Sequence, residues 1–488
     1  MEILVNKFLK FLLLLFFLNN CSLDNKTGIW TKTSKIEEEK IIIKEVFKKE
    51  EALESEFNSE IKVNLISNFK KNSFVNNLTN NNGRINYDGS LKNISKFKFS
   101  KIDNFDQYEP EIAFHKNNVI FFDNKGSILK FDNNSKHIWK KNYYTKAEKK
   151  LKPILFFGNN DDILVVADNI AKYYAININN GELLWSKTNI APFNSQVKIY
   201  KDKFLVIDFE NILRCYSLKN GKEIWQMRTD QSFIKSQKKL SLVIIKNNVF
   251  FNNSVGDITA VNIQTGNLVW QMPTQSSAIY EDAFFLKTSD LIADENSILF
   301  SNNRNEFFSL SASQGQINWK QKINSNLRSS MVENLIFSIS MEGYLIVTDN
   351  KTGNIVRITD VFDQFKRKKS LFPSNTLKKK KKKNKFLPSS KYSSSKPKKK
   401  KKKKKNKFLP SSKYANSQID RLNIKPVGFI LGSKNIYLTT DNGKLLIIDI
   451  RNGRTTSIIK IDNNKISRPF VLNKNLFIIK DNAIIKLN

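Results

Sequence analysis

The side chains that most often carry catalysis or bind metals are sparse in this chain. Its 488 residues include two cysteines, Cys21 and Cys215, and two histidines, His115 and His137. A structural zinc site takes four such ligands at close spacing, and these four are scattered along the sequence. The sequence shows no Ser-His-Asp set, phosphate-binding glycine loop or zinc motif. We therefore expect a non-enzymatic protein with no catalytic residues, no metal site and no cofactor.

Cys21 stands in a setting that suggests a different chemistry, lipid attachment. The N-terminus "MEILVNKFLKFLLLLFFLNNC" has lysines at positions 7 and 10 and an apolar run over 11–18. This run is too short for a membrane span, which takes about 20 residues, and is typical of a secretory signal. Its end resembles a bacterial lipobox, although Asn20 replaces the usual small residue. Residues 1–21 are thus predicted to be a lipoprotein signal with Cys21 as the lipidated residue; an ordinary secretory signal is the alternative.

The positive charge is concentrated in one segment. The chain carries 82 basic and 45 acidic residues, a net charge of +37. Between positions 366 and 413 there are 23 basic residues and no acidic ones, which leaves +14 for the rest of the chain. We predict that 366–417 is a disordered insertion, because like charges and few apolar residues disfavour packing. Contact with anionic lipid is the alternative; nucleic-acid binding is not expected behind a secretory signal.

A glycine followed four residues later by a tryptophan recurs along the chain. The complete pairs are Gly181 with Trp185, Gly221 with Trp225, Gly266 with Trp270, and Gly315 with Trp319. Trp139 follows Ser135 in place of glycine, whereas Gly353 and Gly453 are followed by Arg357 and Ser457. The tryptophans are 40–49 residues apart, the period of a repeat architecture.

Each repeat has the texture of four short strands. A polar residue eight positions before the tryptophan predicts an Asx-type turn that the glycine completes, which is a hairpin signature. Repeats of this kind predict an all-β propeller, in which each tryptophan covers the neighbouring sheet. Seven units are visible, and the C-terminal residues supply three more strands. We predict eight blades over 76–488, the last closed by an N-terminal strand from 89–100; seven blades with a trailing hairpin are the alternative.

The repeat resembles the PQQ-like (pyrroloquinoline-quinone-enzyme-like) repeat. A lipoprotein made only of such repeats is similar to the BamB-like family of the outer-membrane β-barrel assembly machinery, over about 35–365 and 420–488. The resemblance implies a scaffold on the periplasmic face of the outer membrane, anchored by lipid. Its implied partners are the barrel-forming subunit and unfolded outer-membrane proteins, with a monomeric propeller inside the complex and 22–75 as a tether with a short ordered piece.

Two other functions remain open on the same resemblance. The chain could bind another envelope partner, or it could be a degenerate PQQ-dependent dehydrogenase. The quinoprotein enzymes stack their cofactor on a vicinal disulfide, whereas this chain has no adjacent cysteines. The enzyme is therefore the less favoured reading, and the tryptophans are expected to be core residues.

One connection between repeats is unusually apolar. The stretch 272–288, "MPTQSSAIYEDAFFLKT", carries Tyr280, Phe284 and Phe285. Aromatic residues on a loop are a candidate interface, and we expect these three to bind the partner. The alternative is that its second half is the first strand of the next blade.

Overall fold

The computed structural model describes residues 55–66, 83–103, 105–107, 110–230, 236–274, 285–365 and 423–488. All of them belong to one unit, Ala52–Asn488. The expectations for the signal at 1–21, for Tyr280 and Phe284, and for the basic insertion at 366–417 lie outside the described residues.

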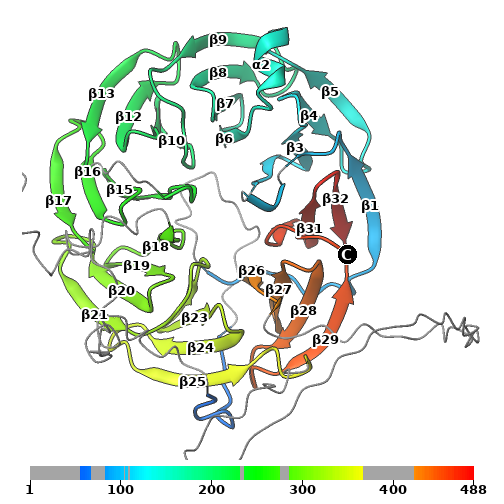
Figure 1. Ribbon diagram of the computed structural model, residues 1–488, viewed down its shortest axis with the longest axis vertical. Helices are drawn as coiled ribbons and strands as arrows, with labels where there is room; N and C mark the ends of the chain where they lie inside the picture. The colour runs from blue at the N-terminus through cyan, green and yellow to red at the C-terminus, as the bar shows by residue number, and fades with distance from the viewer. Residues whose placement is uncertain are drawn as a thin grey trace, which may run out of the picture. The chain divides into compact units, whose positions relative to one another are not determined.

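The described residues form eight four-stranded antiparallel sheets arranged as a ring around a central axis (Figure 1). Blades 1 and 2 contain β2 (Ala113–His115), β3 (Asn118–Phe122), β4 (Ile128–Phe131) and β5 (His137–Lys141), then β6 (Leu155–Asn159), β7 (Ile163–Asp168), β8 (Lys172–Asn177) and β9 (Leu183–Thr188). Blades 3 and 4 contain β10 (Lys198–Tyr200), β11 (Lys203–Ile207), β12 (Ile212–Ser217) and β13 (Glu223–Arg228), then β14 (Leu242–Ile245), β15 (Asn248–Asn252), β16 (Ile258–Asn262) and β17 (Leu268–Met272). Blades 5 and 6 contain β18 (Ile292–Ala293), β19 (Ser297–Asn302), β20 (Glu306–Ser311) and β21 (Ile317–Gln321), then β22 (Ser330–Val332), β23 (Leu335–Ile339), β24 (Tyr344–Asp349) and β25 (Ile355–Asp360). Blade 7 contains β26 (Pro426–Leu431), β27 (Asn435–Thr440), β28 (Lys444–Asp449) and β29 (Thr455–Lys460), and blade 8 contains β30 (Phe470–Leu472), β31 (Asn475–Lys480), β32 (Ala483–Leu487) and β1 (Asn93–Lys98).

The eighth blade joins the two ends of the described chain. β1 pairs with β32 in antiparallel register, from Asn93 opposite Leu487 to Lys98 opposite Ala483. The prediction of an all-β, eight-bladed propeller is confirmed, and the seven-bladed alternative is wrong. Pairing with β1 covers the edge that β32 would otherwise expose.

The middle and outer strands of a blade differ in how deeply their residues are buried. A middle strand such as β7 is packed between neighbouring blades and is apolar almost throughout, with five of its six residues buried. The outer strand β9 alternates between exposed and half-buried residues. The continuous and the alternating hydrophobic patterns are therefore both expected of strands in this sheet.

Helix is confined to two short pieces in the part of the chain that is described. They are the 3-10 turn η1 (Phe105–Gln107) and the five-residue helix α2 (Lys146–Lys150). A capping box begins α2, since Thr145 and Glu148 each accept a hydrogen bond from the other's backbone N–H. A helix this short has no apolar periodicity, so the sequence analysis did not predict it.

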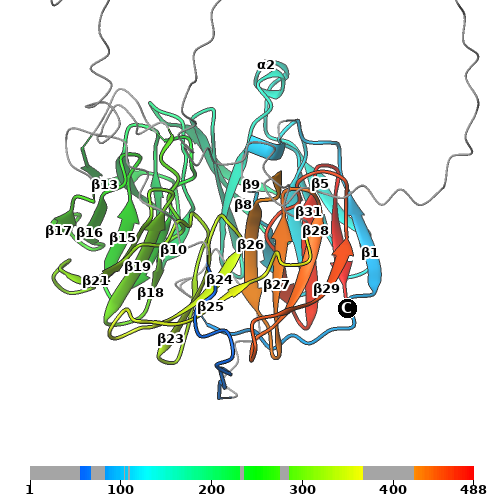
Figure 2. The same cartoon turned by 60° about the horizontal axis from the view of Figure 1, so that its bottom comes forward.

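The antiparallel order gives the ring two different faces. The turns between third and fourth strands, which hold Gly181 and its equivalents, lie on one face, which we call the turn face. The blade-to-blade connections and the turns between second and third strands lie on the opposite face, the connection face. Figure 2 shows α2, which belongs to the connection between blades 1 and 2, projecting from the connection face.

Candidate functional site

The repeated tryptophans bind each blade to the next one. Each indole N–H donates to a main-chain carbonyl in the turn before the next fourth strand, at 2.8–3.1 Å. The donor and acceptor pairs are Trp139 with Asn179, Trp185 with Leu218, Trp225 with Ile263, Trp270 with Ala312, and Trp319 with Asn350. These contacts show that the tryptophans have a structural role. Each one joins two neighbouring blades, and we call such a junction a seam.

The turn glycines are required by two features of the same seam. Gly353, for example, has a φ of 76°, and a Cβ atom placed on it would lie 2.6 Å from the Trp319 ring. Any side chain would therefore strain the backbone and collide with the indole. In the first blade, Ser135 takes the glycine's place with a φ of 63°.

The burial of the tryptophans is graded, which corrects the expectation that all are core residues. Trp139 and Trp319 are 9% and 7% exposed, whereas Trp185, Trp225 and Trp270 are half-buried. These three residues of the outer strands are therefore partly exposed to solvent.

Arg357 occupies the tryptophan position of blade 6. Its Nη2 donates to the carbonyl of Ile450 at 3.1 Å, at the turn position that accepts from the indole in four of the five tryptophan seams. Its Nη1 donates to the carbonyls of Ile61 and Arg451. The guanidinium is fully buried, and burial lowers its pKa to about 10 although Asp449 partly opposes the shift. The sequence showed that an arginine replaces the ring, but not which carbonyl groups its guanidinium binds.

The segment 55–66 lies against this altered seam. Phe57 and Ile358 exchange two backbone hydrogen bonds of 3.1 and 2.8 Å, as in an antiparallel bridge. Val63 is buried, and its N–H donates to the carbonyl of Arg451 at 2.9 Å. In Figure 2 the segment is the dark blue chain on the turn face. It is an ordered piece within the 22–75 stretch, and it straps blade 6 to blade 7.

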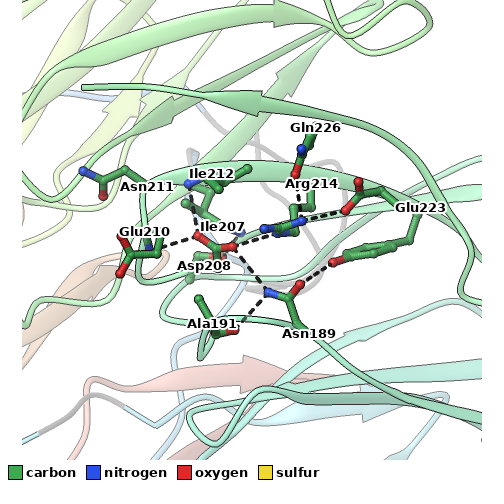
Figure 3. A network of polar contacts seen from close by, with 12 residues as sticks. Asn189, Ala191, Ile207, Asp208, Glu210, Asn211, Ile212, Arg214, Glu223 and Gln226 are labelled. Atoms are coloured by element: carbon green, nitrogen blue, oxygen red, sulfur yellow. Dashed lines mark hydrogen bonds and ion pairs between the residues drawn. The ribbon is translucent and has the colours of Figure 1, made fainter. Parts of the chain in front are cut away.

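A buried polar network fixes a turn of the connection face in blade 3 (Figure 3). Asp208 is fully buried and accepts from the backbone N–H groups of Glu210 and Ile212 at 2.9 and 3.1 Å. Its other carboxylate oxygen accepts from Arg214 Nε at 2.7 Å, and Arg214 also donates to Glu223 at 2.7 Å. Burial alone would lower the pKa of Arg214, but the two carboxylates raise it. The pair is therefore satisfied inside the protein and is structural.

The polar position of this turn recurs around the ring, although it was not predicted from the sequence. In six blades a polar residue lies 17 positions before the tryptophan of the fourth strand, or before the Arg or Ser that replaces it. These residues are Asp168, Asp208, Asn253, Asn302, Ser340 and Thr440. Aligning the repeats on the tryptophans would have revealed it.

A second set of polar residues gathers around the central axis. The first strand of each blade is the innermost one in Figure 1. In five blades a polar or charged residue lies two positions before the start of this strand: Glu111, Gln196, Asp290, Arg328 and Arg468. Glu111 of blade 1 accepts from Lys239 of blade 4 at 2.7 Å and from Arg468 of blade 8 at 3.1 Å. Blades 1 and 4 are not neighbours, so these side chains meet across the axis. We call this group, together with Lys198, Lys238 and Lys239, the axial cluster.

The axial cluster borders a recess of about 310 Å³, its open mouth included. The lining residues are Lys238, Asp290, Asn326, Leu327, Arg328, Val427, Gly428, Phe429 and Arg468. Burial would raise the pKa of Asp290, but the surrounding lysines and arginines hold it below its ordinary value. Lys198 is buried as well, and this burial lowers its pKa to about 8. The cluster was not predicted because its members differ in residue type from blade to blade.

The one described residue of the predicted aromatic interface lies on the connection face. Phe285 is 70% exposed, and β18 does not begin until Ile292, so this residue belongs to the connection between blades 4 and 5. Asn303 donates to the Phe285 carbonyl at 2.9 Å and thereby fixes the backbone there. The next residue, Leu286, is fully buried.

The other chemically reactive residues of the described chain have structural surroundings. Cys215 is fully buried in β12, and burial raises the pKa of its thiol to about 12. Within the described ranges, His, Cys, Asp and Glu side chains form no group of three that could hold a metal ion. Those ranges also hold no helix with the length and apolar character of a membrane span.

Sequence comparison connects the repeats with a known family. Residues 124–359 match a family model described as outer membrane protein assembly factor BamB. A protein of that name from Legionella pneumophila (strain Paris) is 25% identical over 172 residues, which cover 33% of this chain. The match spans only 42% of that relative's length.

Structural comparison supports the propeller fold but not one activity. BamB from Moraxella catarrhalis has a TM-score of 0.57 at 12% identity, covering 82% of this chain and 99% of that one. Quinohemoprotein alcohol dehydrogenase from Comamonas testosteroni has a TM-score of 0.56 at 8% identity, covering 83% and 78%. At these identities the likeness concerns the fold alone. Taken with the family model, the repeats and the eight blades show that the chain is similar to BamB-like propellers of PQQ-like repeats.

Proposed function

We propose that this protein is a non-enzymatic scaffold of the outer-membrane β-barrel assembly machinery. The observation that carries the proposal is the match of residues 124–359 to the family described as an outer membrane protein assembly factor. On this proposal the protein binds the barrel-forming subunit and helps present unfolded outer-membrane proteins. Residues 1–21 are its signal, Cys21 carries the lipid that holds it at the periplasmic face, and 366–417 is an insertion between blades 6 and 7.

We assign the partner-binding surface to the connection face. Phe285 is exposed there, and Tyr280 and Phe284 belong to the same connection in the sequence. Aromatic side chains dominate binding energy at protein interfaces because they remove a large area from water. The network around Asp208 supports this assignment, since it gives the same face a rigid frame.

Detergent extraction of envelopes followed by affinity purification of the full chain tests the function. The expected result is recovery of the barrel-forming subunit, identified by mass spectrometry, in near-equal amount. Recovery of a different envelope protein would replace this function with the alternative of another envelope partner. A tightly bound quinone chromophore in the purified protein would instead favour the dehydrogenase alternative.

A further inference from the structure

The N-terminal part of the described chain lies against the blades whose fourth strands have no tryptophan. The fourth strands of blades 1 to 5 each contain one, whereas β25, β29 and β1 of blades 6, 7 and 8 contain none. Two segments reach this sector: 55–66, which we call the strap, and 83–91. The backbone of the strap is hydrogen-bonded to blades 6 and 7, and the backbone of 83–91 to blades 6, 7 and 8. The N-terminal chain therefore joins blades at places where no indole does.

The two segments differ in how deeply they are buried. In 83–91, Ile85 and Tyr87 are 5% and 1% exposed and belong to an apolar cluster shared by blades 7 and 8. The strap buries one residue, Val63, in an apolar cluster shared by blades 6 and 7, and most of its other residues are exposed. A segment held by few buried contacts opens without the rest of the fold. We therefore expect the strap to leave the ring while 83–91 stays in place.

One end of the strap is held by charge and by backbone pairing. The Glu56 carboxylate accepts from Arg454 Nη2 at 3.2 Å and from the backbone N–H of Asp360 at 3.0 Å. The next residue, Phe57, exchanges two backbone hydrogen bonds with Ile358. Backbone pairing of this kind binds an extended peptide whatever its side chain is at that position. This end of the seam therefore selects a carboxylate followed by an extended residue.

The other end of the strap is held by burial. The Ile61 carbonyl accepts from Arg357 Nη1 at 3.0 Å, and the Val63 N–H donates to the Arg451 carbonyl at 2.9 Å. The Val63 side chain enters the apolar cluster, whereas Ile61 is 42% exposed. Arg357 also donates to the carbonyls of Ile450 and Arg451 in blade 7. These two bonds join blade 6 to blade 7 without the strap, so the ring does not need it to stay closed.

We propose that the turn-face end of the seam between blades 6 and 7 is a peptide-binding site, and that the strap is its internal, releasable ligand. The site takes an extended peptide with a carboxylate opposite Arg454 and, seven positions later, a small branched apolar side chain in the place of Val63. A segment of another chain with these features would compete with the strap for the site. No step of this proposal depends on the partner or the lipid proposed above.

Hydrogen exchange of the full chain, measured by mass spectrometry, tests whether the strap opens by itself. The amides of Phe57 and Val63 should exchange at least about tenfold faster than the amide of Ile85, because local opening frees the strap alone. All three amides donate to ring carbonyls in the structure, so the comparison is between like groups. Equal rates would mean that both segments open together and would overturn the proposal.

Val63→Asp should release the strap, because a charge is costly in the apolar cluster. The Ile358 amide donates to the Phe57 carbonyl, so its exchange should become at least about tenfold faster while the melting temperature stays near that of the parent. Ile61→Asp is the matched control at an exposed position of the strap and should change neither. Unfolding of the whole ring in Val63→Asp, or unchanged exchange at Ile358, would contradict a releasable strap.

A synthetic peptide with the sequence of residues 55–66 tests the binding site itself. Added to the Val63→Asp protein, this peptide should restore slow exchange at Ile358, whereas the peptide that carries Val63→Asp should not. A peptide with Phe57→Pro lacks the N–H that donates to the Ile358 carbonyl and should bind about tenfold more weakly. Failure of the unaltered peptide to protect Ile358 at millimolar concentration, or equal protection by all three peptides, would overturn the assignment of a binding site.

Discussion

The indole N–H of Trp319 donates to the main-chain carbonyl of Asn350 at 2.8 Å and joins blade 5 to blade 6. Trp319 is 7% exposed, and Gly353 of the same turn lies directly against its ring. Apolar burial and a partly buried hydrogen bond thus coincide in one side chain. Stability should therefore depend more on this seam than on seams whose tryptophan is half-buried.

We expect Trp319→Ala to lower the free energy of unfolding by about 3–5 kcal/mol, as large core truncations do. Trp185→Ala should cost less, because part of this ring already contacts solvent. Urea denaturation followed by circular dichroism measures both. Equal losses, or a loss below about 1 kcal/mol at Trp319, the size of an ordinary substitution, would contradict the assignment of the tryptophans to the seams.

Arg357 gives a second test of the seams. Arg357→Leu should destabilise the protein by roughly 3 kcal/mol, because it leaves the carbonyls of Ile450 and Ile61 without their donor. Arg357→Trp restores the residue of the other repeats and the bond to Ile450, but it removes the donor to Ile61. Its stability should stay closer to that of the parent, while amide hydrogen exchange in 55–66 becomes faster. Unchanged exchange in both variants would show that Arg357 does not hold the segment.

Asp168 predicts a pH dependence. Burial raises its pKa to about 6, although hydrogen bonds from Tyr144 and two backbone N–H groups oppose the shift. An ordinary Asp in the unfolded chain has a pKa near 3.9, so between these values the folded state binds more protons. This residue's contribution to stability therefore falls as the pH rises from about 4 to 6.

Asp168→Asn should remove that contribution, since the amide has no charge to bury. Relative to the parent protein, the variant should gain about 2 kcal/mol of stability as the pH rises from 4.5 to 7, at 1.4 kcal/mol per pKa unit. Urea unfolding of both proteins from pH 4.5 to 7 gives the difference directly. A difference that does not change with pH would mean that Asp168 is ionised in the fold at all these values.

Structural features that recur in the repeats could be predicted from the sequence, whereas features that occur at a single place in the ring could not. The pairing of Gly353 with Trp319 follows from a register that recurs in several blades, so the hairpins and the ring could be foreseen. The role of Arg357 could not, because its carbonyl partners come from Ile61 and Ile450, far apart in the sequence. The axial cluster needs the exact start of each first strand and combines different residue types. Phe285 could be placed on a connection, but its exposure depends on how its neighbours fold.

The proposed lipid anchor is tested at Cys21. Its thiol is the only atom of the predicted signal that could carry a thioether-linked lipid, and Cys215 is buried in β12. Cys21→Ala should abolish labelling with a radioactive or alkynyl fatty acid and release the protein into the soluble periplasmic fraction. The matched variant Cys215→Ala should keep the label. Lipid that persists on the Cys21 variant would disprove the assignment.

The last prediction concerns the connection face. The triple variant Tyr280→Ala, Phe284→Ala, Phe285→Ala should lose co-purification of the barrel-forming subunit, since interface aromatics of this kind contribute at least about 2 kcal/mol each. Its melting temperature should remain nearly that of the parent, because Phe285 is 70% exposed and contributes little to the core.

Two variants elsewhere on the ring serve as controls. Leu184→Ala removes an apolar side chain of β9 that is 49% exposed, and Lys222→Ala alters the turn face; neither should change co-purification. These controls separate loss of a specific interface from loss of exposed apolar area in general. Binding that survives the triple variant but fails with Lys222→Ala would move the interface to the turn face, on the side where 55–66 straps blades 6 and 7. The connection between blades 4 and 5 would then have no part in binding.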